Sequence, residues 1–466
     1  MSRSATLGEL RASGWVSRPV KQELRENAVA QLRAGRALVG GVLGYEETVM
    51  PQLANAILAG HDVIFLGERG QAKSRIIRSM VDLLDEYMPI VAGSEINDDP
   101  YAPISIHARH LIADRGDDTP IEWVHRSRRF GEKLATPDTS VADLIGEVDP
   151  IKVAEGRYLS DELTIHYGLV PRTNRGIFAI NELPDLAERI QVGLLNVLEE
   201  RDVQIRGYKI QLPIDLMLFA SANPEDYTNR GRIITPLKDR FGSLIRTHYP
   251  LDVEHEVAVI EQEASSLATD GVAVDLPGFM TAIVAEISQL ARRSPHINQR
   301  SGVSVRMSIT NYEILIANAT RRALMSGETM TVPRICDLDA LVASTGGKVE
   351  IETIEDGREM QVLDRIVKAA VLETFRSRVR PEHLGALVKA FETGLVVSAG
   401  EEVPSADYVK LLPDLPGLSG ILADLEVGES PAAVASAMEF VLEGMHLTKR
   451  LNKESVGGAT TYSGRG

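Results

Sequence analysis

Short apolar runs alternate with amphipathic segments through the first half of the chain. Val63–Leu66, Gly176–Ile180 and Leu216–Ser221 are runs bounded by turn residues, which is typical of strands buried on both faces of a parallel sheet. Segments with helical periodicity lie before and between them, including residues 22–38 and 46–59. This alternation predicts a doubly wound α/β domain, which we place at residues 1–250.

The second half of the chain has a different pattern. Residues 251–395 consist almost entirely of helical patterns and predict a separate helical lid domain. Residues 396–466 are acidic and rich in proline and glycine. We expect a loop-rich region there, with one helix at about residues 432–447 and a disordered tail from residue 453.

A glycine-rich loop, GERGQAKS, follows the first apolar run. It fits the phosphate-binding pattern G-x-x-x-x-G-K-[ST] except that Ala72 replaces the second glycine. Backbone N–H groups of such a loop surround phosphate oxygens, Lys73 places a positive charge near the β- and γ-phosphates, and the Ser74 hydroxyl ligates Mg²⁺. Alanine fits the loop if its φ is negative, and residues 74–88 predict an amphipathic helix. The candidate nucleotide-binding residues are Gly67, Glu68, Arg69, Gly70, Gln71, Ala72, Lys73 and Ser74.

Polar residues at the ends of the next two runs complete a candidate ATPase site. Asn181 and Glu182 stand where P-loop ATPases carry Asp-Glu, of which the first orders Mg²⁺ and the second polarises the attacking water. Asn181 can accept a hydrogen bond from a metal-bound water but brings no charge, so we expect weak Mg²⁺ retention and slow basal turnover. Asn223 follows the third run and can orient that water, so Glu182 and Asn223 are candidate catalytic residues.

Two arginines and a predicted hairpin are further candidates for a functional role because of their positions in the chain relative to these motifs. Arg240 comes shortly after the third run, and Arg306 opens a helical segment of the second half. A guanidinium placed against the γ-phosphate stabilises charge in the transition state. Alternating residues around Gly207 predict a β-hairpin that carries Arg206 and Lys209.

The amino-acid composition of the chain argues against several classes of function. A formal net charge of −16 argues against indiscriminate binding to nucleic acid or anionic membranes. The single cysteine, Cys336, excludes an internal disulfide and is expected to be a small buried residue. His107 and His110 lack a matching carboxylate pattern, so we expect a structural role for both. No signal peptide or apolar run of roughly 20 residues is present, which favours a cytoplasmic protein without a membrane span.

These motifs, in this order, resemble those of the AAA+ family, and within it the branch of MoxR and the magnesium-chelatase ATPase subunit. The matching pieces are GERGQAKS (Walker A), IFAINEL (Walker B), FASANPEDY (sensor 1), PLKDRFG (arginine finger) and GVSVR (sensor 2). DLIGEVDP, followed by GLVPRTNRGIFAINE, is similar to the insert and lead-in of this branch. The resemblance covers about residues 38–325.

The resemblance implies an α/β P-loop NTPase fold of the AAA+ type, with a doubly wound parallel sheet followed by an all-α lid domain. It implies ATP and Mg²⁺ as cofactors, the metal lying at Ser74 and Asn181. It also implies a homo-oligomeric ring, a hexamer or similar, in which Arg240 is catalytic at the neighbour's nucleotide and Arg306 binds nucleotide from the lid. The usual partner in this branch carries a von Willebrand A domain with its metal-ion-dependent adhesion site.

The leading hypothesis is an ATP-driven motor that remodels a partner or inserts metal into it. One alternative is a nucleic-acid-acting AAA+ ATPase, which Arg206 and Lys209 on the hairpin favour and the acidic chain disfavours. The other is a nucleotide-binding scaffold with low turnover, which Asn181 favours.

Overall fold

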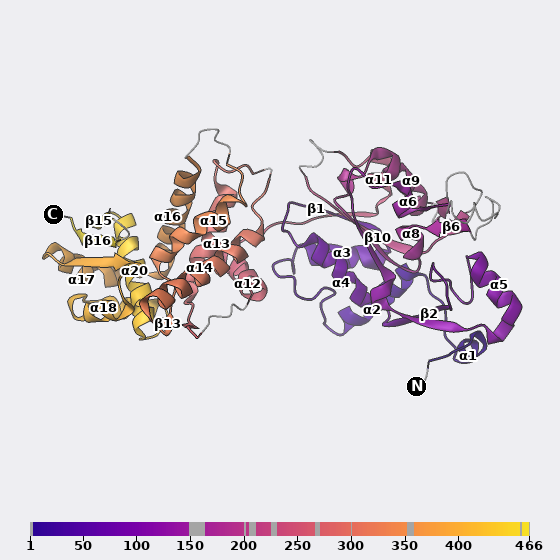
Figure 1. Cartoon of the computed structure of the whole chain (residues 1–466), viewed down its shortest axis with the longest axis horizontal. Coiled ribbons are helices and arrows are strands. Elements are labelled where there is room, and N and C mark those ends of the chain that lie inside the picture. The colour runs from indigo at the N-terminus through magenta and orange to yellow at the C-terminus, as the bar shows by residue number, and fades with distance from the viewer. Residues whose placement is uncertain are drawn as a thin grey trace. The chain divides into compact units, whose positions relative to one another are not determined.

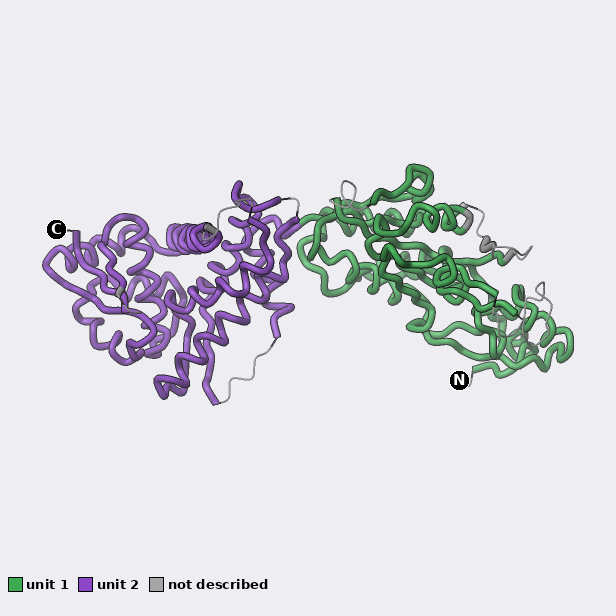
Figure 2. Tube along the Cα trace, turned by 45° about the horizontal axis from the view of Figure 1, so that its top comes forward, with its two compact units in different colours: residues 1–248 green, residues 249–466 purple. Residues whose placement is uncertain are grey.

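The chain folds into two compact units, residues 1–248 and 249–466 (Figure 2). The computed structural model describes residues 3–148, 164–199, 202–204, 211–224, 231–265, 271–299, 301–351, 358–456 and 459–465. Residues 251–395 and 396–466, which we predicted as separate regions, belong to one unit.

The first unit is built on a parallel sheet of five strands in the order β11-β1-β10-β7-β4. Figure 1 labels β1 and β10 of this sheet. Each strand runs parallel to its neighbours. The strands are β1 (Val63–Leu66), β4 (Phe130–Leu134), β7 (Gly176–Asn181), β10 (Leu216–Ala222) and β11 (Ser243–Arg246). Every residue of β1, β7 and β10 is buried, which confirms the strands predicted from the apolar runs.

Helices cover both faces of this sheet. The helices of the unit are α1 (Leu7–Ala12), α2 (Val20–Arg33), α3 (Val49–Ala59), α4 (Lys73–Ser79), α5 (Ile106–Arg115), α6 (Val141–Leu144), α8 (Leu169–Arg172), α9 (Glu188–Glu199) and α11 (Thr235–Arg240). Phe65 and Phe219 join α2, α3 and α4 in one apolar core, whereas Ile64 and Phe178 join α9 and α11 in another. Alternate strand residues thus face opposite cores, and the unit is doubly wound as predicted.

The first unit also contains three antiparallel pairs of strands. They are β2 (Tyr87–Val91) with β3 (Ile121–His125), β5 (Gly146–Val148) with β6 (Ile165–Tyr167), and β8 (Asp202–Gln204) with β9 (Gln211–Pro213). The pairing of β8 with β9 confirms the stem of the predicted hairpin, while its turn, with Arg206, Gly207 and Lys209, lies outside the described residues.

The helix predicted over residues 74–88 is too long. Helix α4 ends at Ser79, a 3-10 turn covers Met80–Leu83, and the chain then enters β2. The aromatic and β-branched residues of β2 favour a strand once β3 is present to pair with it, and that partner is distant in sequence.

The second unit is mainly helical, as the predicted lid is. Its helices are α12 (Val253–Glu263), α13 (Gly278–Arg293), α14 (Val305–Ser326), α15 (Leu341–Gly346), α16 (Arg358–Arg378), α17 (Pro381–Glu392), α18 (Ser405–Lys410), α19 (Leu418–Asp424) and α20 (Pro431–Leu447). Two small sheets, which the sequence did not predict, contain β12 (Ala273–Val274), β13 (Met330–Thr331), β14 (Val396–Gly400), β15 (Leu451–Val456) and β16 (Ala459–Gly464). No helix among the described residues combines the length and the apolar character needed to cross a membrane.

Residues 396–466 are more ordered than expected. They contain three helices, α18 to α20, and the tail forms β15 and β16 in place of the predicted disorder. The physical reason is Tyr462, which is 2% exposed and donates its hydroxyl hydrogen to Glu443 Oε2 at 2.6 Å. One apolar core runs from Ile260 to Tyr462 and joins this region to the preceding helices.

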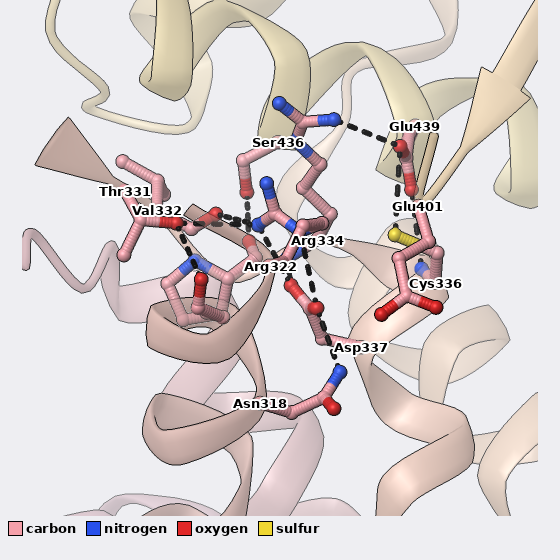
Figure 3. A network of polar contacts seen from close by, with 12 residues as sticks. Asn318, Arg322, Thr331, Val332, Arg334, Cys336, Asp337, Glu401, Ser436 and Glu439 are labelled. Carbon is pink, nitrogen blue, oxygen red and sulfur yellow. Dashed lines mark hydrogen bonds and ion pairs between the residues drawn. The ribbon is translucent and has the colours of Figure 1, made fainter. Parts of the chain in front are cut away.

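A buried ion-pair network, made of Arg322, Arg334, Asp337 and Glu439, fixes α20 to the middle of the second unit (Figure 3). Arg322 donates from Nη2 to Asp337 Oδ2 at 2.9 Å and from Nε to Oδ1 at 3.2 Å. The Asp337 carboxylate also accepts from the Arg334 backbone N–H at 2.8 Å, and Arg334 lies 3.9 Å from Glu439 of α20. Cys336 lies beside this network and is partly exposed, where a buried cysteine was expected. Its partial burial raises the pKa of the thiol.

Candidate functional site

The glycine-rich loop joins β1 to α4 at the carboxyl edge of the parallel sheet. It begins where the Gly67 N–H donates to Ala222 O of β10 at 3.1 Å, and it ends at Lys73, the first residue of α4. A Cβ on Gly67 would lie 1.9 Å from Thr247 Oγ1, so only glycine fits there. The loop is therefore packed against the ends of two neighbouring strands, the place where ligands bind in open α/β sheets.

Ala72 differs from the expectation. Its φ is +54°, in the left-handed region, whereas the sequence argument required a negative φ. Glycine occupies that region without a steric penalty, and an alanine costs about 1–2 kcal/mol there. The loop thus keeps the backbone shape of the glycine version and carries the strain of a Cβ.

Lys73 lies at the centre of a hydrogen-bonded chain. It is 7% exposed, and its Nζ donates to Gly67 O, to Glu68 O at 2.7 Å and to Asn223 Oδ1 at 2.7 Å. The other end of the Asn223 amide, Nδ2, donates to Glu182 Oε2 at 2.7 Å. Three candidate residues from three different motifs are therefore in direct contact, as the order of the motifs suggested.

A second group of contacts forms the metal end of the site. Asn181 Oδ1 accepts from Ser74 Oγ and from Ser221 Oγ, both at 3.3 Å. Asn181 Nδ2 points the other way and donates to Glu132 Oε1 of β4 at 2.5 Å. Glu182 follows directly with φ +55°, and its backbone N–H donates to Ser221 Oγ at 3.2 Å.

These oxygens fit Mg²⁺ only together with a nucleotide. Ser74 and Asn181 present hard oxygen donors, which suit this ion. Among the described residues, no group of three or more His, Cys, Asp and Glu side chains could hold a metal by itself. Phosphate oxygens would have to supply the remaining ligands, which is the usual arrangement for Mg²⁺ in nucleotide sites.

Gln71 ties the loop to the end of β11. Its Oε1 accepts from Thr247 Oγ1 at 2.7 Å, and its backbone carbonyl accepts from Tyr45 Oη at 3.0 Å. Tyr45 Oη also donates toward His248 O at 2.7 Å. The side chains of Thr247 and Tyr45 therefore hold the loop in shape through their contacts with Gln71.

Comparisons with known proteins identify several similar chains. No protein-family model matches the chain. It is 26% identical over 361 residues to magnesium-chelatase subunit ChlI of Nostoc sp., which covers 71% of this chain and 90% of that protein. It is 26% identical over 358 residues to ChlI of Nephroselmis olivacea, covering 70% and 93% of the two chains. These relatives support a ChlI-like protein of the AAA+ type.

Other matches are shorter or more distant. The ChlI-1 protein of Arabidopsis thaliana, described as chloroplastic, is 28% identical over 230 residues, or 48% of this chain and 50% of that one. A solved complex of magnesium-chelatase subunits BchI and BchD matches at 19% identity and a TM-score of 0.35, over 69% of this chain and 97% of that one. No conclusion rests on a whole-chain similarity that low.

The two arginines of the ChlI-like pattern belong to helices α11 and α14. Arg240 is the last residue of α11, and its Nη1 donates to Pro236 O at 2.9 Å. Arg306 is an exposed residue in the first turn of α14, in the second unit. Their roles at the nucleotide stay predictions. Outside the site, His107 Nε2 donates a hydrogen bond to Ala92 O at 3.2 Å.

Glu132 is the site residue that the sequence reasoning missed. It lies on β4, whose sequence FGEKL is short and partly polar, so no apolar run announces the strand. The signal available was positional, since a strand beside β7 was needed to complete the sheet. Glu132 enters the site because β4 and β7 are in register, with Glu132 beside Ala179 and Leu134 beside Asn181.

Proposed function

We propose that this chain is an ATP-driven motor of the chelatase subunit I type, which hydrolyses ATP at the carboxyl edge of the sheet in its first unit. The observation that carries the proposal is the chain of contacts from Lys73 through Asn223 to Glu182. It places a cation for phosphate, an amide and a carboxylate side by side at the end of a glycine-rich loop. The ChlI relatives support the same class of protein.

In the proposed reaction, Lys73 exchanges its bonds to loop carbonyls and Asn223 for bonds to the β- and γ-phosphates. Asn223 and Glu182 then hold a water molecule against the γ-phosphorus. The water oxygen forms a bond to phosphorus, its proton passes to Glu182, and the bond to the bridging oxygen of ADP breaks. ADP and phosphate leave, and Glu182 returns the proton to solvent.

Mg²⁺ bound with ATP would neutralise charge on the phosphate oxygens. Ser74 and Asn181 are the residues that would hold it, since their oxygens face one another at 3.3 Å. The neutral amide of Asn181 is consistent with a slow basal rate.

The assembly and the client follow from the resemblance. We propose a homo-oligomeric ring in which Arg240 completes the site of the neighbouring subunit and Arg306 contacts nucleotide from the lid. The partner would carry a von Willebrand A domain, and ATP hydrolysis would remodel that partner or load metal into it. A nucleic-acid role would need the hairpin residues Arg206 and Lys209, so the same assays include single-stranded DNA.

The substitution Lys73→Ala tests the proposal. It removes the buried ammonium that faces the phosphates, so we expect the affinity for ATP, measured by calorimetry, to fall by about a hundredfold or more, because a charge-assisted contact of several kcal/mol is lost. Circular dichroism should show that the variant is folded. Unchanged affinity would mean that GERGQAKS does not bind phosphate here. A parent protein that binds ATP but never hydrolyses it, with or without DNA, would favour the scaffold instead.

A further inference from the structure

The side-chain amide of Asn181 can adopt two orientations, and its contacts show which of them is present. An amide has one oxygen that suits a metal-bound water and one NH₂ group that does not. Here Nδ2 is engaged by Glu132 Oε1 at 2.5 Å, and Oδ1 is left facing Ser74 Oγ at 3.3 Å. The carboxylate is an acceptor only, so it selects the orientation in which the oxygen faces Ser74.

Glu132 also connects strands β4 and β7 to helix α4. Glu132 of β4 binds Arg78 through two hydrogen bonds, from Nε at 2.9 Å and from Nη2 at 3.0 Å. Arg78 lies four residues after Ser74 on α4, so both side chains are on one face of the helix. Glu132 therefore contacts Asn181 of β7 on one side and Arg78 of α4 on the other, beside the metal end of the site.

The charge of Glu132 remains useful in spite of Arg78. The Glu132 side chain is 22% exposed, whereas Arg78 is 62% exposed and its charge is screened by water. A carboxylate against Nδ2 also polarises the Asn181 amide and makes its oxygen a better acceptor. The negative charge that P-loop ATPases carry at position 181 is thus present on the neighbouring strand.

We propose that Glu132 is the positioning residue for the metal end of this site, fixing Asn181 Oδ1 toward Ser74 and supplying the carboxylate that Asn181 lacks. The inference rests on the proposed nucleotide site. It changes what is expected of Asn181→Asp, because a second carboxylate would lie against Glu132 and the two like charges would repel each other. The gain from an aspartate at position 181 therefore requires Glu132→Gln in the same chain.

The test measures Mg²⁺ dependence of ADP binding by calorimetry on the full chain, without reference to turnover. We expect Glu132→Gln to leave ADP affinity in the absence of Mg²⁺ unchanged. The Mg²⁺ concentration that half-maximally increases ADP affinity should rise by about tenfold or more, as for other groups that orient metal ligands. The double variant Glu132→Gln/Asn181→Asp should recover the parent dependence.

Two further variants make the test specific. Glu122→Gln is the matched control, because Glu122 lies on β3, outside the glycine-rich loop. Its carboxylate forms an ion pair with exposed Arg128 at 3.1 Å. The variant should titrate like the parent. Arg78→Gln removes a mostly exposed side chain and should lower the Mg²⁺ requirement, so the proposal can be tested even if Glu132→Gln folds poorly.

The outcomes separate this inference from the proposed function. Titration curves for Glu132→Gln that superimpose on the parent would overturn the role of Glu132 alone. Loss of ADP affinity without Mg²⁺ would also overturn it, because the residue would then support the loop and not the metal end. A parent protein that binds no nucleotide would overturn the proposed function itself.

Discussion

Lys73 in the first unit and Arg322 in the second are both buried cations, yet they are held differently. Arg322 is 2% exposed and is bound through two nitrogens to the carboxylate of Asp337, itself fully buried. The bonds of Lys73 to Gly67, Glu68 and Asn223 all go to neutral oxygens. Each cation offsets the cost of burial through its hydrogen bonds, and two of the bonds of Arg322 reach a carboxylate.

The difference separates a structural use of charge from a functional one. A cation that is neutralised by an internal carboxylate attracts a charged ligand only weakly. Removal of one partner of the pair leaves the other as a buried, uncompensated charge. The described bonds of Lys73 go to carbonyl and amide oxygens of the loop and of Asn223, which a phosphate can replace. Variants in the two places should therefore have opposite signatures, one in stability and the other in chemistry.

The largest effect is expected for Asp337→Ala, which leaves Arg322 without its carboxylate. We predict a loss of about 3–5 kcal/mol in the unfolding free energy of the second unit. The chain has two tryptophans, Trp15 and Trp123, and both lie in the first unit. Circular dichroism should therefore show an early transition that tryptophan fluorescence does not follow.

The control is an exposed pair in the same unit. Asp364 and Lys368 form an i,i+4 ion pair on α16 at 2.7 Å, with both side chains at least half exposed. Asp364→Ala should change stability by about 0.5 kcal/mol or less. Equal losses for the two substitutions would show that burial of the network contributes nothing.

The next effect is expected in chemistry alone. Glu182→Gln keeps an oxygen that can accept from Asn223 but cannot take a proton from water. We predict unchanged ATP affinity and turnover reduced by about a hundredfold or more. Mixing this variant with Arg240→Ala subunits should recover part of the activity, because some interfaces then pair an intact Glu182 with an intact Arg240. Parent-like hydrolysis by Glu182→Gln would remove it from the mechanism.

The smallest effect concerns the backbone of the loop. Ala72→Gly replaces a residue at φ +54° and should stabilise the first unit by about 1 kcal/mol, measured by urea unfolding followed through tryptophan fluorescence. The matched control is Ala30→Gly, at an exposed position inside α2, which should destabilise by about 0.5–1 kcal/mol. If both substitutions destabilise, Ala72 is not strained.

The sequence was sufficient for the centre of the sheet and for the order of the motifs. Continuous apolar runs identify β1, β7 and β10 because both faces of those strands are buried. The carboxyl ends of parallel strands meet at one edge, so Lys73, Glu182 and Asn223 were expected together. The ChlI relatives agree with the fold class that follows from these motifs.

The parts that could not be predicted depend on partners distant in the chain. Strand β4 is recognised only by its pairing with β7, and Glu132 acquires its role from that register. The sign of φ at Ala72 depends on the shape of the whole loop, not on local preference. The tail became a sheet because β14 was available to pair with it, which residue composition does not report.

The position of β16 has a consequence for how the protein is made. It is the middle strand of its sheet, between β14 and β15, so neither outer strand has a partner until β16 exists. A ribosome that adds about 5–20 residues per second needs roughly 3–12 s to proceed from Gly400 to Ala459. During that interval β14 has no partner strand, and an unpaired strand edge can pair with another chain and cause aggregation. The order of three strands thus sets a time window in which the growing chain depends on the cell to keep it soluble.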